Sequence, residues 1–382
     1  MRRLLSILLL AALHGGALAD ADRMLTDSLL AVAQSRVPEA LSTVDQLTRQ
    51  HPNFRLAHLV RGDLLLARAR PLDTLGNVNT RGGELQQLRD EARQRVRAAT
   101  DPLPQDKVPA YLLNLDDGYR HALVVDASRS RLYVYANRAG LPVRVADFYV
   151  TIGKAGTGKE REGDNRTPIG IYNVSGFKSR QELTDFYGSG AFTLSYPNEW
   201  DARQGRNGHG IWIHGSPSNT YSRAPRASEG CVVLANDDLT RLGQYIETGK
   251  TPVIIAEAVE WVALDALAER RNDLAAALEN WRHDWESRDT ARLIAHYHPQ
   301  FRSGGQDLGS FRASKQKVNA GKTWIKVGLD RVSLMLYPER PDFALVSFVQ
   351  DYRSNNLNDR TVKRQFWRRD NGRWTIIHET SL

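Results

Sequence analysis

The hydrophobic pattern changes its period along the 382 residues of the chain, and this change constrains the fold more than any other feature. From residue 22 to about residue 99, apolar residues recur at helical spacing. From residue 119 to 256, apolar and polar residues alternate as in half-buried strands. Helical spacing returns after residue 257, and alternating runs follow it to the end. One regular architecture cannot satisfy both periods, so the sequence predicts several domains.

The first nineteen residues resemble an export signal. Arg2 and Arg3 precede an apolar run at 4–13, and the Ala-Leu-Ala at 17–19 offers small residues for cleavage. The run is too short to cross a bilayer as a helix. We therefore exclude residues 1–19 from the fold and expect a periplasmic protein with no transmembrane segment.

The composition limits the partners. The formal net charge is +8, with no dense basic block, so nucleic acid is not an expected partner. A carboxylate-rich extracytoplasmic partner fits a mild positive charge better. The chain has a single cysteine, Cys231, which excludes an intrachain disulfide and leaves the role of this thiol open.

The N-terminal part, residues 20–100, is expected to be helical. Two apolar stripes are separated by the break at His51-Pro52-Asn53, where a new helix would start. This pattern resembles one helix-turn-helix unit of a tetratricopeptide array, but no second copy follows at a fixed period. We expect an isolated helical region and a linker at 101–104.

The central part, residues 119–256, is expected to form a mostly antiparallel β-domain. Alternating runs at 121–126, 131–136 and 143–151 predict its first strands, and 251–256 predicts its closing strand. A linker helix at 257–275 and an α+β domain at 276–382 are expected to follow. In that last domain Asn371-Gly372 predicts a type I′ hairpin, because both central residues of that turn need positive φ.

The segment between His214 and Cys231 carries the chemistry. His214 ends a strand-like run, Cys231 precedes another, and sixteen polar, glycine-bearing residues lie between them. A thiol attacks a carbonyl as thiolate, and an adjacent imidazole can take its proton. Gly215 and Gly230 would allow backbone amides to approach a substrate oxyanion.

These motifs resemble the L,D-transpeptidase (YkuD-type) family of bacterial cell-wall enzymes. The family pattern is His-Gly, a loop, then Ser-x-Gly-Cys, preceded by a Thr-Pro-x-Gly-x-Tyr strand that matches residues 167–172. The resemblance implies Cys231 as nucleophile, His214 as general base and acid, and Ser228, Gly230 and Gly215 as supports of the site.

The sequence departs from the family pattern at two places. Many members carry a histidine directly before Gly-Cys and an arginine or asparagine two residues after the cysteine, where this chain has Glu229 and Val233. Guanidinium groups bind carboxylates in bidentate fashion, so three arginines in or beside the loop are candidates for binding a substrate carboxylate: Arg206, Arg223 and Arg226.

Parts of the sequence also resemble sites for two other ligand types. A zinc site would use His209, His214 and Cys231, but on a regular strand the two histidines would face opposite sides and a fourth ligand is lacking. The segment 153–159 has the Gly-x4-Gly-Lys frame of a phosphate loop, but Glu160 follows where Ser or Thr would bind magnesium. We read it as a mobile basic loop, and expect no metal and no cofactor.

The aromatic residues after residue 278 and the terminal hairpin resemble the cone-shaped fold of the nuclear transport factor two-like (SnoaL-type) superfamily. This resemblance implies a module for dimerisation or for binding a glycan or small ligand, without catalysis. L,D-carboxypeptidases that control cell shape have a similar layout.

Together with the export signal, the family resemblance implies an exported cysteine acyl-transfer enzyme acting on peptidoglycan stem peptides through a thioacyl intermediate. Transfer to an amine would make it a transpeptidase, and transfer to water an L,D-carboxypeptidase or hydrolase. A non-catalytic wall-binding scaffold is the alternative from another class.

Overall fold

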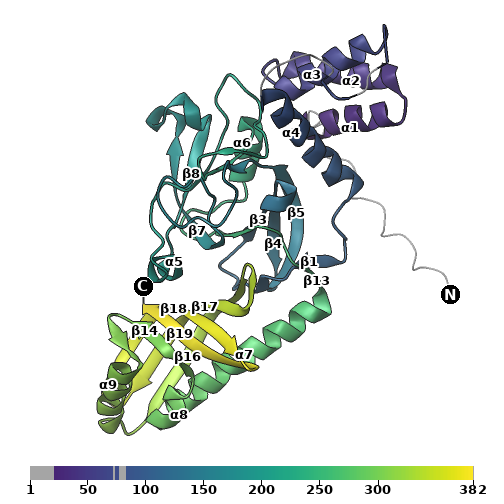
Figure 1. The fold of residues 1–382 in the computed structure, drawn as a ribbon. Helices are drawn as coiled ribbons and strands as arrows, with labels where there is room; N and C mark the ends of the chain where they lie inside the picture. The colour runs from purple at the N-terminus through teal and green to yellow at the C-terminus, as the bar shows by residue number, and fades with distance from the viewer. Residues whose placement is uncertain (1–20, 72–73, 77–82, 382) are drawn as a thin grey trace, which may run out of the picture. The chain divides into compact units, whose positions relative to one another are not determined.

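The computed structural model describes residues 21–71, 74–76 and 83–381. The chain divides into two compact units, residues 1–99 and 100–382, which we describe separately (Figure 1). The predicted signal peptide lies outside the described residues. Among the helices that are described, none is both long and apolar enough to cross a membrane.

The first unit is helical, as predicted. Helix α2 ends at Gln50 and α3 begins at Arg55, so the chain turns at the predicted break. Arg95 on α4 is buried and pairs with Asp22 on α1 and, at 2.8 Å, with Glu91. The ion pair between Arg95 and Asp22 joins α4 to α1. The helices span α1 (Ala21–Ala33), α2 (Val37–Gln50), α3 (Arg55–Leu66) and α4 (Gly83–Thr100).

The second unit begins with the mostly-β domain. Its main sheet has the order β11-β9-β8-β7-β12-β3-β4-β5, and all neighbours are antiparallel except β11–β9 and β12–β3. Its strands are β3 (His121–Asp126), β4 (Arg131–Arg138), β5 (Leu141–Tyr149), β7 (Gly170–Ser179), β8 (Gly190–Leu194), β9 (Trp212–His214), β11 (Val232–Val233) and β12 (Pro252–Ala256). A separate short parallel pair joins β6 (Ile152–Gly153) to β10 (Arg226–Ser228).

The middle of this sheet is buried on both faces. On β3, Leu123 and Val125 belong to one hydrophobic cluster, while Ala122 and Val124 belong to another. Strands covered on both sides are apolar at every position, which explains the continuous run in the sequence. Shorter helices complete the domain: α5 (Glu199–Arg203), α6 (Asn236–Gly243), and the 3₁₀ turns η1 (Ala127–Arg129), η2 (Arg180–Glu182) and η3 (Asp185–Tyr187).

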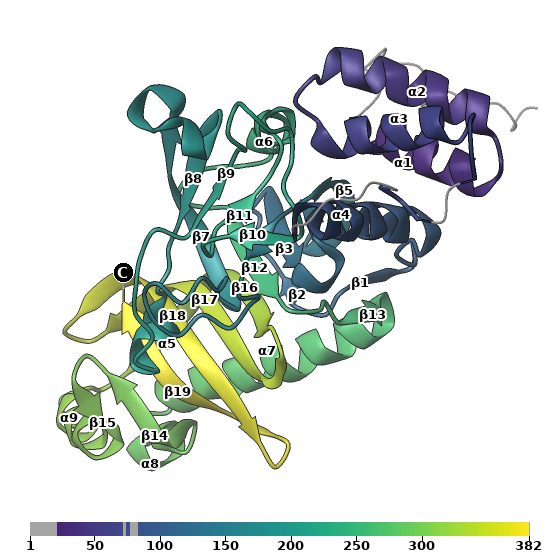
Figure 2. The same ribbon diagram turned by 45° about the horizontal axis from the view of Figure 1, so that its top comes forward.

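The last part of the chain is a seven-stranded sheet with helices against it (Figures 1 and 2). Asn371 and Gly372 both have positive φ, 50° and 80°, which confirms the predicted hairpin. The elements are β13 (Trp261–Ala263), α7 (Leu264–Glu286), α8 (Thr290–Ile294), β14 (Tyr297–Ser303), β15 (Gln306–Asp307), α9 (Leu308–Ala320), β16 (Ile325–Tyr337), β17 (Arg340–Ser354), β18 (Asn358–Asp370) and β19 (Arg373–Ser381).

The C-terminal sheet takes a strand from the other end of the unit. Strand β2 (Leu112–Asn114), which precedes the β-domain in sequence, pairs with β16 and forms the edge of the C-terminal sheet, while β1 (Lys107–Pro109) pairs with β13. The sequence did not predict either short strand. The boundary expected between residues 275 and 276 falls inside α7, a single helix, and the domain bounds stay a prediction.

The two parts of the second unit share one hydrophobic core. Trp200 on α5 packs on Phe343 and Phe366 of the C-terminal sheet, with ring centroids 4.4 and 5.9 Å apart. The amide of Asn198 donates a 2.9 Å hydrogen bond to the hydroxyl of Tyr337 on β16. Apolar contact and a buried polar bond thus both hold the C-terminal sheet against the β-domain.

Candidate active site

Two adjacent strands carry His214 and Cys231. His214 is the last residue of β9, and Cys231 directly precedes β11. The strands are parallel, with Val232 opposite Ile213 and Val233 opposite His214. Continued by one residue, this register sets Cys231 beside Trp212. Because side chains two residues apart on a strand share a face, Cys231 and His214 lie on the same face.

The imidazole of His214 is held in one tautomer. Its Nδ1 lies 2.7 Å from the carbonyl oxygen of Gly215, and because a carbonyl only accepts, Nδ1 carries the hydrogen. In the neutral ring, Nε2 is therefore the atom with a free lone pair. The ring is buried and packs on Tyr187 and Phe186 of η3, with centroids 5.1 and 5.9 Å away.

Burial sets the protonation state of His214. It lowers the pKa of the imidazole to about 4, the Gly215 hydrogen bond opposes this shift, and the Arg223 cation adds to it. The ring is therefore neutral at neutral pH. A neutral, oriented imidazole is the form that can accept a proton.

The thiol of Cys231 is also neutral at rest. Burial raises its pKa to about 11, although a hydrogen bond from the backbone of Trp212 and the charges of Arg223 and Lys159 favour the thiolate. Its Sγ donates to the carbonyl oxygen of Gly210 at 3.3 Å. The residue keeps part of its surface exposed, so a substrate can reach it.

The residues around Cys231 and His214 are held by the backbone. The hydroxyl of Ser228 donates to the carbonyl of Cys231 at 2.6 Å and accepts from the amide of Gly230 at 3.1 Å. The amide of Gly215 donates to the carbonyls of Tyr187 and Gly190. The amides of Gly215 and Gly230, which we expected to face an oxyanion, thus already donate within the protein.

The three arginines of the sequence prediction lie in different surroundings. Arg223 lies with its guanidinium 4.9 Å from the ring centre of Phe186, and its positive charge favours the thiolate form of Cys231. Arg206 instead pairs at 3.0 Å with the fully buried Asp201. Arg226 is largely exposed and lies 3.8 Å from Glu257. Of the three arginines, only Arg223 has a charge that acts on both Cys231 and His214.

His209, one of the three residues considered as zinc ligands, lies outside the strand that carries His214. It precedes β9, and its side chain is 82% exposed, 3.5 Å from Glu162. The parity argument therefore does not apply to it. Within residues 21–71, 74–76 and 83–381, no group of three or more His, Cys, Asp or Glu side chains is placed to hold a metal ion.

Two features of the site could not be predicted from the sequence pattern. The aromatic pair Phe186 and Tyr187 covers His214 from a 3₁₀ turn that no hydrophobic period announces. Thr167 hydrogen-bonds the carbonyl of Gly230, next to Cys231, at 2.9 Å. Its place in a Thr-Pro-x-Gly-x-Tyr block was the only signal.

Two family models match the chain. The model of the L,D-transpeptidase catalytic domain matches residues 120–255, and that of the Cds6 C-terminal NTF2-like domain matches residues 273–380. A search of curated proteins found no match.

Solved structures match more than two thirds of the chain. The structure of Bd1075 from Bdellovibrio bacteriovorus is 30% identical, with a TM-score of 0.65, and the match covers 72% of this chain and 98% of that one. The helical cell shape determining protein Pgp2 from Campylobacter jejuni is 24% identical, with a TM-score of 0.60, over 75% and 99%.

The match of the β-domain to the L,D-transpeptidase catalytic domain places the chain in a class of enzymes that act on peptidoglycan. The chain belongs to the L,D-transpeptidase (YkuD-type) family. It carries an NTF2-like domain after the catalytic domain, a layout shared with Bd1075 and Pgp2.

Proposed function

We propose that this protein is an exported cysteine acyl-transfer enzyme that cleaves the L,D bond at the end of a tetrapeptide stem of peptidoglycan. The observation that carries the proposal is the parallel register of β9 and β11, which gives Cys231 and His214 a common face. The tautomer set by the Gly215 carbonyl supports it, because it leaves Nε2 free to accept a proton.

The first half-reaction forms a thioester. Sγ of Cys231 bonds to the carbonyl carbon of the third stem residue, while the thiol proton passes to Nε2 of His214. With the pKa of the thiol near 11 and that of the imidazole near 4, a resting ion pair is unfavourable. Proton transfer therefore accompanies formation of the carbon–sulfur bond.

The tetrahedral intermediate then breaks its carbon–nitrogen bond. His214 returns the proton to the departing nitrogen, and D-alanine leaves with a free amino group. The thioester retains the energy of the peptide bond, so no nucleotide is required. Arg223 binds the terminal carboxylate of the stem, because it is the arginine beside Cys231 and can form paired hydrogen bonds.

The acceptor decides the product. Attack on the thioester by an amine gives a cross-link, and attack by water gives a trimmed stem. Trimming is the second candidate, because the chain shares its layout with Pgp2, which is named as a determinant of helical cell shape. Periplasmic location and binding of glycan, small ligand or a second copy by the C-terminal domain belong to the same proposal.

Mass spectrometry of defined tetrapeptide muropeptides tests the proposal. The purified protein is expected to release D-alanine and to gain the mass of the acyl group during turnover. Dimers would identify transpeptidation, and monomeric tripeptides alone would identify trimming. The variant Cys231→Ala is the control, and D-alanine release that survives in it would refute the proposed nucleophile. A wild-type protein that leaves every muropeptide unchanged favours the scaffold alternative.

A further inference from the structure

A buried ion pair organises the loop at residues 154–167, which leads from β6 towards β7. The ammonium of Lys159 donates to the carboxylate of Asp164 at 2.8 Å and to the carbonyl of Arg161 at 3.1 Å. The side chains are only 4% and 9% exposed. The sequence had suggested a mobile basic loop here, but Lys159 is buried and paired.

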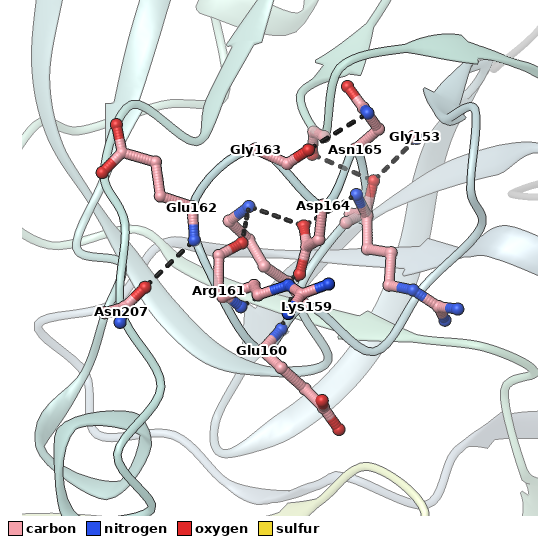
Figure 3. Close-up of polar contacts among 12 residues, drawn as sticks. Gly153, Lys159, Glu160, Arg161, Glu162, Gly163, Asp164, Asn165 and Asn207 are labelled. Atoms are coloured by element: carbon pink, nitrogen blue, oxygen red, sulfur yellow. Dashed lines mark hydrogen bonds and ion pairs between the residues drawn. The ribbon is translucent and has the colours of Figure 1, made fainter.

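Asp164 accepts four hydrogen bonds inside this loop (Figure 3). Its Oδ1 accepts from Lys159 Nζ and from the backbone N–H of Arg166, at 2.8 and 3.1 Å. Its Oδ2 accepts from the backbone N–H groups of Glu160 and Arg161, at 2.8 and 3.0 Å. Burial alone would raise the pKa of Asp164, but these hydrogen bonds lower it to about 2. The carboxylate is thus ionised at neutral pH.

The loop contacts the residue before the thiol. Thr167 donates to the carbonyl of Gly230 at 2.9 Å and accepts from the amide of Gly153 at 2.9 Å. A Cβ atom at Gly230 would lie 2.8 Å from the carbonyl oxygen of Arg166, so the two backbones are in close contact. Since Arg166 is itself held by Asp164, the position of Gly230 depends on the shape of this loop.

The loop also holds residues 207–210, a second segment that the thiol contacts. The side-chain oxygen of Asn207 accepts from the backbone N–H of Glu162 at 3.0 Å, and the backbone N–H of Asn207 donates to the carbonyl of Glu160 at 3.1 Å. Three residues further on, the carbonyl of Gly210 accepts from Sγ of Cys231. Both Glu160 and Glu162 belong to the turn that Asp164 stabilises.

We propose that Asp164, paired with Lys159, is a positioning residue for Cys231, because it holds the 154–167 loop in the shape that contacts both Gly230 and the segment at 207–210. The kinetic part of this inference rests on the proposed function. The structural part does not, because the reactivity of the thiol can be measured without any peptidoglycan substrate.

The variant Asp164→Asn tests the proposal. An asparagine has one acceptor oxygen, so two of the four donors lose their partner. A loosened loop admits water to a thiol whose pKa is raised by burial, so alkylation by iodoacetamide at pH 8 is expected to become faster. A fall of one pKa unit makes the thiolate about tenfold more abundant. Release of D-alanine is expected to slow about 10- to 100-fold, because the sulfur is misplaced.

Glu160→Gln is the matched control, since it also removes one carboxylate from the loop. Its side chain is exposed and points away from Asp164 (Figure 3), and its contacts in the network are made by the backbone. This variant is expected to keep wild-type alkylation and turnover. Intact-mass measurement of alkylation over a range of pH, with thermal unfolding as a check of the fold, separates the two variants.

Thr167→Val is the second variant, because it keeps the shape of the side chain and removes the bond to Gly230. Like Asp164→Asn, it is expected to alkylate faster and to turn over more slowly. If Asp164→Asn does not fold, Thr167→Val alone tests whether the loop positions Cys231. Wild-type alkylation profiles in the folded variants would overturn the proposal, even with slower turnover. Faster alkylation together with a wild-type enzyme that releases no D-alanine would support the positioning role and refute the proposed function.

Discussion

The Nδ1 atom of His214 lies 2.7 Å from the carbonyl oxygen of Gly215, the next residue in the chain. A histidine that hydrogen-bonds a backbone carbonyl needs no carboxylate to fix its tautomer. The arrangement also avoids a nearby negative charge that would raise the pKa of the ring. Burial therefore keeps the imidazole neutral. This can be tested by measuring how the free energy of unfolding depends on pH.

His214 should make the free energy of unfolding depend on pH between about 4 and 6.5. The folded pKa of about 4 lies below the unfolded value, so the unfolded state binds the extra proton. The stabilisation is complete above the unfolded pKa and is lost as the pH falls towards 4. The full effect is about 3 kcal/mol. Urea titrations of the wild type and His214→Gln at pH 4.5 and 7 should show a smaller pH effect in the variant.

His209→Gln is the control for this measurement, because His209 is an exposed histidine a few residues before His214. It should retain the pH dependence of the wild type. An equal pH dependence in His214→Gln and in the wild type would contradict a buried, neutral His214.

Arg223→Gln should weaken substrate binding. A charge-assisted hydrogen bond to a buried carboxylate is worth about 1.5–3 kcal/mol, so KM for a tetrapeptide stem should rise about 10- to 100-fold. Arg226→Gln removes the same charge from a largely exposed position beside Glu257 and should leave KM almost unchanged. Equal effects of the two substitutions would argue for a general charge effect in place of a specific contact.

Tyr337→Phe should destabilise the second unit without touching the catalytic residues. The variant removes the oxygen that accepts from the amide of Asn198, and an unsatisfied buried donor costs about 1–3 kcal/mol. The midpoint of thermal unfolding should therefore fall, while the alkylation rate of Cys231 in the folded protein stays the same. An unchanged midpoint would show that water replaces the lost partner.

A fragment of residues 100–256 should not fold as a stable catalytic domain. Leu112 and Leu113 belong to the hydrophobic core that also contains residues of β16 and β17, and truncation would expose them. A chain beginning at residue 100 is the control, because it keeps the whole second unit. Soluble expression and cooperative unfolding should be retained in the control and lost in the truncation, and a cooperative 100–256 fragment would disprove the shared core.

The sequence was sufficient where local rules decide the structure. The Asn371-Gly372 hairpin followed from the positive φ that both residues adopt. The strands β3 and β4 followed from alternating or continuous apolar runs. Strands β1 and β2 were not predicted. Each has only three residues, too few to show a period, and their partners, β13 and β16, lie far away in the chain.

The site residues stay a prediction, and only part of their geometry followed from the sequence. The spacing of His214 and Cys231 marked the pair, and the parallel register sets them on one face. The burial of Lys159 and Asp164 could not be predicted, because a Gly-rich stretch with several charges is usually a solvated loop. The use of the Gly215 and Gly230 amides inside the protein was equally invisible, since any backbone amide can serve either purpose.

The pairing of β2 with β16 has a consequence for the order in which the chain folds. The side chain of Asn114 on β2 bonds the backbone of Val332, 218 residues further along. Closing so long a loop is entropically costly and slow. Because the chain is synthesised from its N-terminus, the 112–114 segment has no strand partner until β16 has been made. The early edge strand is therefore a site where a chaperone or another unfinished chain could bind before the C-terminal sheet is complete.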